Sequence, residues 1–222
     1  MPYLADMIHN LSTSNSIANH FIAEMRDATI QTYKMRFRRN MERVGEIMAY
    51  EISKTLTYQL REVETPLGIA EVYVPQQDIV LGTILRAGLP MHQGFLNYFD
   101  FADNAFVSAY RRHHKDGTFD IQVEYTSCAS LEGKVVIMCD PMLATGASMV
   151  LTMQELMSNG VPEKIHIATI IATTDGIRHV QRNLPQVDIW AGAIDEEMTA
   201  RSFIVPGLGD AGDLAYGEKL QD

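Results

Sequence analysis

The segment Lys134-Val-Val-Ile-Met-Cys-Asp-Pro-Met-Leu-Ala-Thr-Gly-Ala-Ser148 carries most of the information about the fold. Its apolar run, residues 135–139, predicts a buried strand. Apolar residues then recur at helical spacing, and Gly160 and Pro162 mark the end of that helix. The apolar helix positions are Met149, Val150, Met153, Leu156 and Met157. A strand, a tight loop and a helix therefore follow one another directly.

The loop at residues 140–148, here called the phosphate loop, has the residues of an anion site. Thr145, Gly146 and Ser148 would place free backbone N–H groups and two hydroxyls around one point. These N–H groups and the helix dipole favour negative charge by about 0.3 to 1 kcal/mol. Asp140 ends the strand at the carboxyl edge, where α/β sheets carry ligands, and its carboxylate can accept sugar hydroxyls. The alternative is an ordinary helix start capped by Thr145 or Ser148.

Two common nucleotide-binding motifs are missing from this loop. No Gly-Lys-Ser/Thr sequence forms a Walker motif, and no Gly-x-Gly-x-x-Gly sequence follows the strand. The sequence therefore argues against nucleoside triphosphate hydrolysis and against hydride transfer from a dinucleotide.

Short apolar runs alternate with amphipathic segments from Ile79 onward. We expect strands at residues 79–85, 105–110, 135–139, 165–172 and 187–193, and helices at 89–98, 148–159 and 174–184. This alternation predicts an α/β fold with a mostly parallel sheet flanked by helices on both faces. Residues 16–58 have a helical pattern instead, and residues 69–74 indicate a hairpin strand at an edge of a sheet.

A second hairpin is expected within the alternation. The polar residues 111–117 end in Asp116-Gly117 and precede an alternating run at 119–125, which predicts a β-hairpin arm near 111–125. No repeat or linker divides the chain, and 222 residues suit one domain. Its parts would be an N-terminal helical and edge-hairpin region (1–78), a core (79–200), and a loop with the C-terminal tail (201–222).

Composition restricts the partners of the protein. The net charge of −10 and the pI near 5.1 give no general field toward nucleic acid or an acidic membrane. The two cysteines indicate no disulfide framework, and no apolar run of about 18 residues indicates a membrane span. No histidine has metal-ligand spacing. We expect a cytoplasmic protein with no nucleic-acid partner, no membrane partner and no metal site built by protein side chains alone.

Three sequence blocks together resemble the uracil phosphoribosyltransferases, which are type I phosphoribosyltransferases. They are the phosphate loop, Ile84-Leu-Arg-Ala-Gly-Leu89 and Phe203-Ile-Val-Pro-Gly-Leu-Gly-Asp-Ala-Gly-Asp213, here called the base loop, in the order found in that family. The resemblance covers about residues 79–219. It implies the type I phosphoribosyltransferase fold and the conversion of uracil and 5-phosphoribosyl 1-diphosphate (PRPP) to UMP and diphosphate in pyrimidine salvage.

The resemblance also implies the roles of individual residues. Catalytic roles would fall to Asp140, Arg86 and Asp210. PRPP would bind Arg86, Arg111, Asp140, Pro141, Met142, Leu143, Ala144, Thr145, Gly146, Ala147, Ser148 and Asp210. Uracil would bind Ile204, Gly209, Asp210 and Ala211, largely through the backbone.

The residues alone leave alternatives open at each block. Arg86 has a planar fork that matches diphosphate oxygens, yet it could be a surface arginine at a turn. Arg111 and Lys115 belong to a cluster that is commonly a solvated loop, but before a hairpin it could close over PRPP and exclude water. The proline and glycines of the base loop permit an unusual backbone path, which could also be purely structural.

The implied reaction displaces diphosphate through a cationic state, so separated charge must be stabilised. Mg²⁺ bound mainly through PRPP oxygens would neutralise the leaving group, and no protein ligand is assigned. The family and the apolar N-terminal helical region suggest a homodimer or a higher homo-oligomer. The alternatives are a phosphoribosyltransferase for another base, or a pyrimidine-sensing regulator that retains the PRPP pocket.

Three positions depart from the family pattern. Ala147 stands where a second glycine is usual, and Ser202 and Phe203 stand where glycine and tyrosine are usual. The extra methyl group of Ala147 requires an unstrained backbone. Loss of the tyrosine hydroxyl would free Asp210 from a partner.

Overall fold

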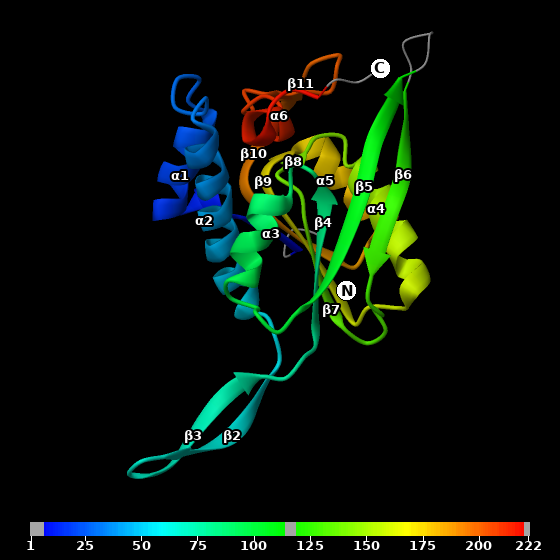
Figure 1. Cartoon of the computed structure of the whole chain (residues 1–222). Helices are drawn as coiled ribbons and strands as arrows, with labels where there is room; N and C mark the ends of the chain where they lie inside the picture. Colours follow the sequence, from blue (N-terminus) through cyan, green and yellow to red (C-terminus); the bar gives the residue numbers. More distant parts are fainter. Residues whose placement is uncertain (1–6, 114–118, 220–222) are drawn as a thin grey trace.

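The centre of the molecule is a mostly parallel sheet (Figure 1). This computed structural model describes residues 7–113 and 119–219. The strands across the sheet are, in order, β1 (Ile8–Asn10), β10 (Val187–Asp195), β9 (Lys164–Thr173), β7 (Val135–Cys139), β4 (Ile79–Leu85), β5 (Asp103–His113) and β6 (Phe119–Cys128). A short strand, β8 (Met142–Leu143), also pairs with β9. β6 runs antiparallel to β5, whereas the other neighbours in this order are parallel.

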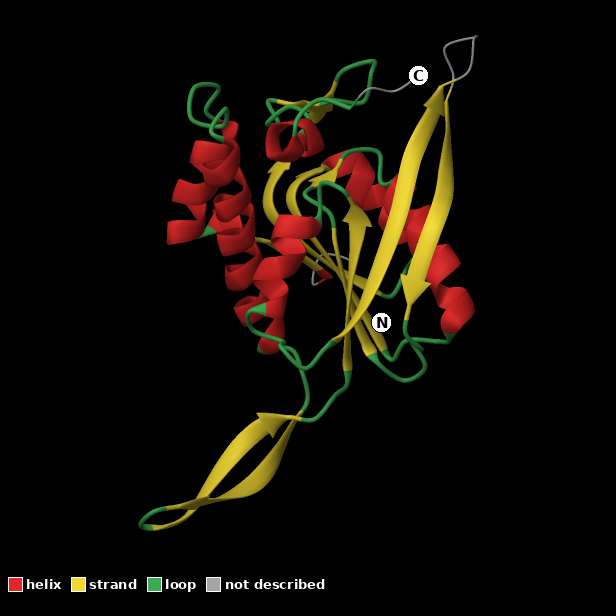
Figure 2. Ribbon diagram, in the orientation of Figure 1, coloured by secondary structure: helices red, strands yellow, loops and turns green. Residues whose placement is uncertain are grey.

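Helices cover both faces of the sheet (Figure 2). α1 (Ile17–Arg26), α2 (Lys34–Ser53) and α3 (Leu89–Leu96) lie on one face, and α4 (Ala147–Leu156) and α5 (Thr174–Asn183) lie on the other. Successive strand residues point to opposite faces, so Leu81 packs in one apolar cluster with Phe95, while Val80 packs in another with Met149. The predicted α/β architecture, a mostly parallel sheet flanked by helices on both faces, is confirmed.

The helical pattern expected over residues 16–58 is divided between two helices. Between α1 and α2, the Asp27 Oδ1 atom accepts hydrogen bonds from the N–H groups of Thr29 and Ile30 (2.8 and 3.1 Å). Such a side-chain turn competes with helical hydrogen bonding and interrupts the helical path. The break allows α1 to fold back beside α2, and both helices bury residues in the same apolar cluster.

The first hairpin, β2 (Tyr58–Thr65) and β3 (Gly68–Pro75), forms a separate two-stranded sheet that projects from the body (Figure 1). The expected hairpin is present, and it forms a sheet of its own instead of joining the main sheet. All residues of β2 are exposed, and the charged Arg61 and Glu62 are adjacent along the strand. A strand with a charge on each face offers no continuous apolar face to the core, which explains why it stays outside.

The second hairpin is the antiparallel pair β5–β6. The register pairs Ala105 with Cys128 and continues to His113 opposite Phe119. The arm predicted near 111–125 is present, but β5 extends through His113, so Arg111 lies in a strand and not in a solvated loop. The predicted Asp116-Gly117 turn and Lys115 lie outside the described residues.

Within the described ranges, none of the helices combines the length and the apolar content that crossing a bilayer requires.

Candidate active site

The phosphate loop begins where β7 ends, at the carboxyl edge of the sheet. Asp140 follows β7 directly, and its N–H donates to the Ala168 carbonyl of β9 (3.1 Å). The Pro141 carbonyl accepts from the N–H groups of Ile170 and Ile171 (3.1 and 3.0 Å). The first half of the loop is therefore fixed to a neighbouring strand, and the predicted succession of strand, loop and helix is confirmed.

Gly146 turns the chain from the loop into α4. Its φ of 74° lies in the left-handed region, which glycine adopts without strain. A β-carbon here would lie 2.7 Å from the Gly176 carbonyl oxygen and 3.1 Å from Val180 Cγ2. The Thr145 hydroxyl accepts the Ala147 N–H at 3.3 Å, and Gly146 itself brings no side-chain cap. The other first-turn N–H groups of α4 have no intrahelical acceptor and can bind an anion.

Two residues outside the predicted set support the loop from α5. Thr173, the N-cap residue of α5, donates its hydroxyl hydrogen to the Ala144 carbonyl (2.6 Å) and accepts the Gly176 N–H (2.8 Å). A β-carbon on Gly176 would lie 2.7 Å from the Leu143 carbonyl oxygen, so only glycine lets α5 approach this closely. The capping threonine before a predicted helix was the available sequence signal, since Thr173 stands directly before the expected start at residue 174.

The carboxylates of Asp140 and Asp210 come from distant sequence blocks and interact in the folded protein. Burial raises the pKa of Asp140 to about 7, a hydrogen bond from the Met142 N–H opposes this, and the negative charge of Asp210 raises the pKa further. The Asp140 residue is half-buried. The phosphate loop and the base loop therefore lie close enough for the charge of Asp210 to act on the Asp140 carboxyl.

The base loop begins with a short strand, β12 (Ile204–Val205), which pairs antiparallel with β11 (Glu197–Met198). Its Val205–Pro206 peptide is cis, and the φ angles of Gly207 and Gly209 are 56° and 94°. Asp210 caps α6 (Ala211–Tyr216), because its Oδ1 accepts the Asp213 N–H (3.0 Å). This backbone contact fixes the Asp210 carboxylate, although Phe203 replaces the tyrosine that is usual in the family and so offers it no hydroxyl.

Arg86 connects the first and third sequence blocks. Its Nη2 atom lies 3.3 Å from Asp213 Oδ1 and donates to the Gly217 carbonyl (3.1 Å). The guanidinium remains exposed, so it borders the site from the side of α6. Arg111 pairs through its backbone with Ile121, and its side chain lies outside the described part of the structure.

The unusual residues Ala147 and Ser202 sit in different backbone environments. Ala147 is the first residue of α4 and has a regular helical backbone, so its methyl group causes no backbone strain. Ser202 has φ of 61°, a conformation that favours glycine. Phe203 is 47% exposed, and its N–H donates to Thr199 Oγ1 (3.1 Å). Of the three residues that differ from the family pattern, Ser202 is therefore the one whose backbone conformation is strained.

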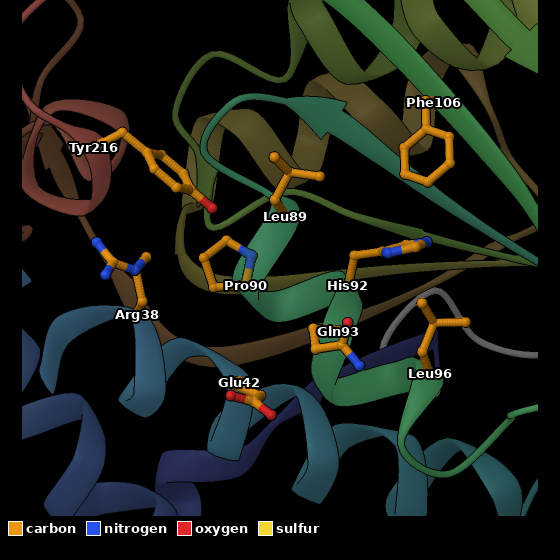
Figure 3. Close-up of a pocket in the computed structure, with 9 residues that line it drawn as sticks. All are labelled: Arg38, Glu42, Leu89, Pro90, His92, Gln93, Leu96, Phe106 and Tyr216. Atoms are coloured by element: carbon orange, nitrogen blue, oxygen red, sulfur yellow. The ribbon is translucent and has the colours of Figure 1, made fainter. Parts of the chain in front are cut away.

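A pocket of about 420 Å³ lies beside α3 (Figure 3). It is lined by Arg38, Glu42, Leu89, Pro90, His92, Gln93, Leu96, Phe106 and Tyr216. Figure 3 shows Arg38 and Tyr216 on one side of Leu89 and the rings of His92 and Phe106 on the other. None of the predicted site residues whose side chains the structure describes lines it, so this pocket is a neighbour of the site and not its centre.

At the carboxyl edge of the sheet, the phosphate loop turns at Gly146 into a helix N-terminus, and the base loop follows the last strand of the chain's core. Together with the mostly parallel sheet, this arrangement defines the class of type I phosphoribosyltransferases. A family model described as uracil phosphoribosyltransferase matches residues 12–218. The chain belongs to the uracil phosphoribosyltransferase family, whose members are pentosyltransferases.

Relatives from bacteria and archaea agree with this assignment. A protein of Porphyromonas gingivalis named uracil phosphoribosyltransferase is 56% identical over 216 residues, which cover 97% of this chain and 100% of the relative. One of Pyrococcus furiosus with the same name is 34% identical, over 90% of this chain and 86% of the relative. A solved structure of an Aquifex aeolicus protein superposes with a TM-score of 0.86 at 28% identity, covering 97% and 100% of the two chains.

Proposed function

We propose that this protein transfers the phosphoribosyl group of PRPP to uracil and releases UMP and diphosphate. The observation that carries the proposal is that the phosphate loop and the base loop lie close enough for the charge of Asp210 to raise the pKa of Asp140. A sugar held between the two loops would place its 5′-phosphate on one loop and its anomeric carbon toward the other. Family membership supports the same reaction.

On this proposal, the phosphate loop binds the 5′-phosphate of PRPP, which stays on the ribose and becomes the phosphate of UMP. Residues 141–148 surround the 5′-phosphate with backbone N–H groups at the start of α4, and Asp140 accepts hydrogen bonds from the ribose hydroxyls. Arg86 and Arg111 hold the diphosphate. The contact of 3.3 Å between Arg86 and Asp213 is long for an ion pair of this kind, so the exposed guanidinium can turn to a stronger anionic partner.

The base loop would select uracil through its backbone. Ile204 and Ala211 are buried and Gly209 is exposed, so the loop offers fixed carbonyl and N–H groups at the edge of the site. Uracil presents a ring N–H between two carbonyls, and cytosine reverses part of this pattern. A wrong base would leave buried polar groups unpaired at a cost of about 1 to 3 kcal/mol each. Asp210 is the candidate base for the uracil proton.

We propose that a divalent cation acts at this site as a partner of the substrate. Within the described residues, no cluster of three or more His, Cys, Asp or Glu side chains could hold a metal ion. The neighbouring Asp140 and Asp210 carboxylates are hard oxygen donors of the type Mg²⁺ uses when most of its ligands come from phosphates. Mg²⁺ bound in this way would neutralise charge on the departing diphosphate. Chelation of the cation should then stop diphosphate release.

One assay separates the proposal from its alternatives. The protein is incubated with PRPP, Mg²⁺ and one nucleobase at a time, and diphosphate release is measured. Release that depends on uracil supports the proposal. Release with another base instead would identify a phosphoribosyltransferase of different specificity, and PRPP binding without release would identify a regulator that retains the pocket.

We also propose a homodimer or higher homo-oligomer in the cytoplasm. The β2–β3 hairpin leaves Leu67, Ile69 and Tyr73 exposed, which is consistent with contact to another chain. Sedimentation analysis of the purified protein gives the oligomeric state, and a monomer at all concentrations would contradict the proposal.

A further inference from the structure

We propose that Arg26 and Asp195 are positioning residues for the nucleobase, because together they fix the turn of the base loop at Gly207. This inference rests on the proposed function. Neither residue belongs to the phosphate loop or the base loop. Arg26 is the last residue of α1, and Asp195 is the last residue of β10.

Arg26 and Asp195 form a well-aligned ion pair. The Nη1–Oδ2 and Nη2–Oδ1 distances are both 2.8 Å, so the guanidinium binds both carboxylate oxygens. The Asp195 side chain is 7% exposed and the Arg26 side chain is 23% exposed. Two parallel, partly buried contacts of this kind restrict the orientation of both groups more than one contact can.

The same pair takes both backbone hydrogen-bonding groups of Gly207. Arg26 Nη1 donates to the Gly207 carbonyl (3.0 Å), and Asp195 Oδ2 accepts the Gly207 N–H (2.9 Å). Burial alone would raise the pKa of Asp195, but the hydrogen bonds from Arg26 and Gly207 hold it below its ordinary value. Asp195 is therefore charged at neutral pH and the three-way contact persists there.

Fixing Gly207 also fixes the residues expected to meet the base. The φ of Gly207 is 56°, and the turn brings its α-carbon against Ile204, where an added β-carbon would lie 2.9 Å from the Ile204 carbonyl carbon. The position of Gly207 therefore determines the direction of the Ile204 carbonyl. It also determines the path of the chain toward Gly209. The phosphate loop has its own support from Thr173 and Gly176 and does not depend on this pair.

The test measures the affinity for base and PRPP separately. Arg26→Met should raise the KM for uracil about tenfold or more, which corresponds to losing about one charge-assisted contact. The dissociation constant of PRPP should change by less than about twofold, because the phosphate loop is untouched. Arg26→Lys keeps the positive charge but cannot make two parallel contacts with Asp195, so its KM for uracil should lie between those of the wild type and Arg26→Met.

Arg36→Met is the matched control. Arg36 also forms a two-contact pair, with Glu24 of α1 (Nε–Oε2 2.9 Å, Nη2–Oε1 2.7 Å), but that pair has no bond to the base loop. Its KM for uracil should stay at the wild-type value. PRPP binding by each variant also reports that it is folded.

The outcomes distinguish this inference from the proposed function. The wild-type rate with uracil tests the proposed function, and the ratio of variant to wild-type KM, for whichever base the wild type uses, tests the inference. An unchanged KM in Arg26→Met would overturn it. An equal loss of base and PRPP affinity would also overturn it, since the pair would then act only through general stability.

Discussion

Replacing Asp140 with asparagine should lower turnover steeply and, at the same time, stabilise the fold above neutral pH. Burial, with the charge of Asp210, raises the pKa of Asp140 from 3.8 to about 7 on folding. A carboxyl whose pKa rises on folding binds protons more tightly in the folded state. Its ionisation cost is absent below the unfolded pKa, grows as pH rises between the two values, and is complete above about pH 7.

The size of this effect follows from the shift. Each pH unit between the two pKa values is worth about 1.36 kcal/mol. From about pH 5 to about pH 8 the wild type should therefore lose about 2 to 3 kcal/mol of unfolding free energy relative to Asp140→Asn, since the asparagine does not ionise. Other titrating groups are shared by the two proteins and cancel in the comparison.

Urea unfolding of both proteins without PRPP, at about pH 5 and about pH 8, measures this difference. Asp210→Asn serves as the control. Burial and the Asp210 charge both raise the Asp140 pKa, and this variant removes only the smaller effect, so the Asp140 pKa should fall only in part. If the stability difference between wild type and Asp140→Asn is the same at both pH values, the carboxyl is not desolvated and the reasoning is refuted. Diphosphate release by Asp140→Asn should fall by about a hundredfold or more.

Three further predictions concern the backbone and a buried histidine. Ser202→Gly should raise the unfolding free energy by about 0.5 to 1 kcal/mol in urea titrations, because it relieves a left-handed serine. Gly146→Ala should weaken PRPP binding in calorimetry by about tenfold or more, whereas Gly133→Ala, also at positive φ but in open space, should leave PRPP affinity unchanged. Burial lowers the pKa of His166 to about 4, so the stability that neutral His166 contributes is complete above its unfolded pKa of 6.5 and is lost as pH falls toward 4. The Trp190 Nε1–H donates to His166 Nδ1 (3.2 Å), so Trp190 fluorescence should change over the same pH range. In His166→Gln this fluorescence should not change with pH over that range, which would identify His166 as the titrating group.

The sequence predicted the core well because its signals there are local. The apolar run 135–139, the glycine turn and the helix after it form one continuous pattern, and the strand 79–85 was predicted with the bounds that β4 has. Both depend on side chains a few residues apart.

The parts that sequence analysis missed depend on distant partners. The alternation in β3 indicates a strand but not which sheet it joins, so the detached hairpin was not foreseen. β5 continues into a polar arm where no apolar pattern marks its end. The pairing of Arg26 with Asp195 joins residues 169 positions apart, and no local pattern of charges specifies such a partner.

The spacing of these contacts along the chain sets an order in which the two halves of the site can be completed during synthesis. Thr173 and Ala144, which support the phosphate loop, are 29 residues apart, whereas Arg26 meets Gly207 across 181 residues. The longer closure costs about 1.5 kcal/mol more in chain entropy, and it must wait until the ribosome has made the chain through Gly207. A nascent polypeptide can thus assemble its anion-binding half first, while Arg26 of α1 stays without its partners until Asp195 and Gly207 have emerged.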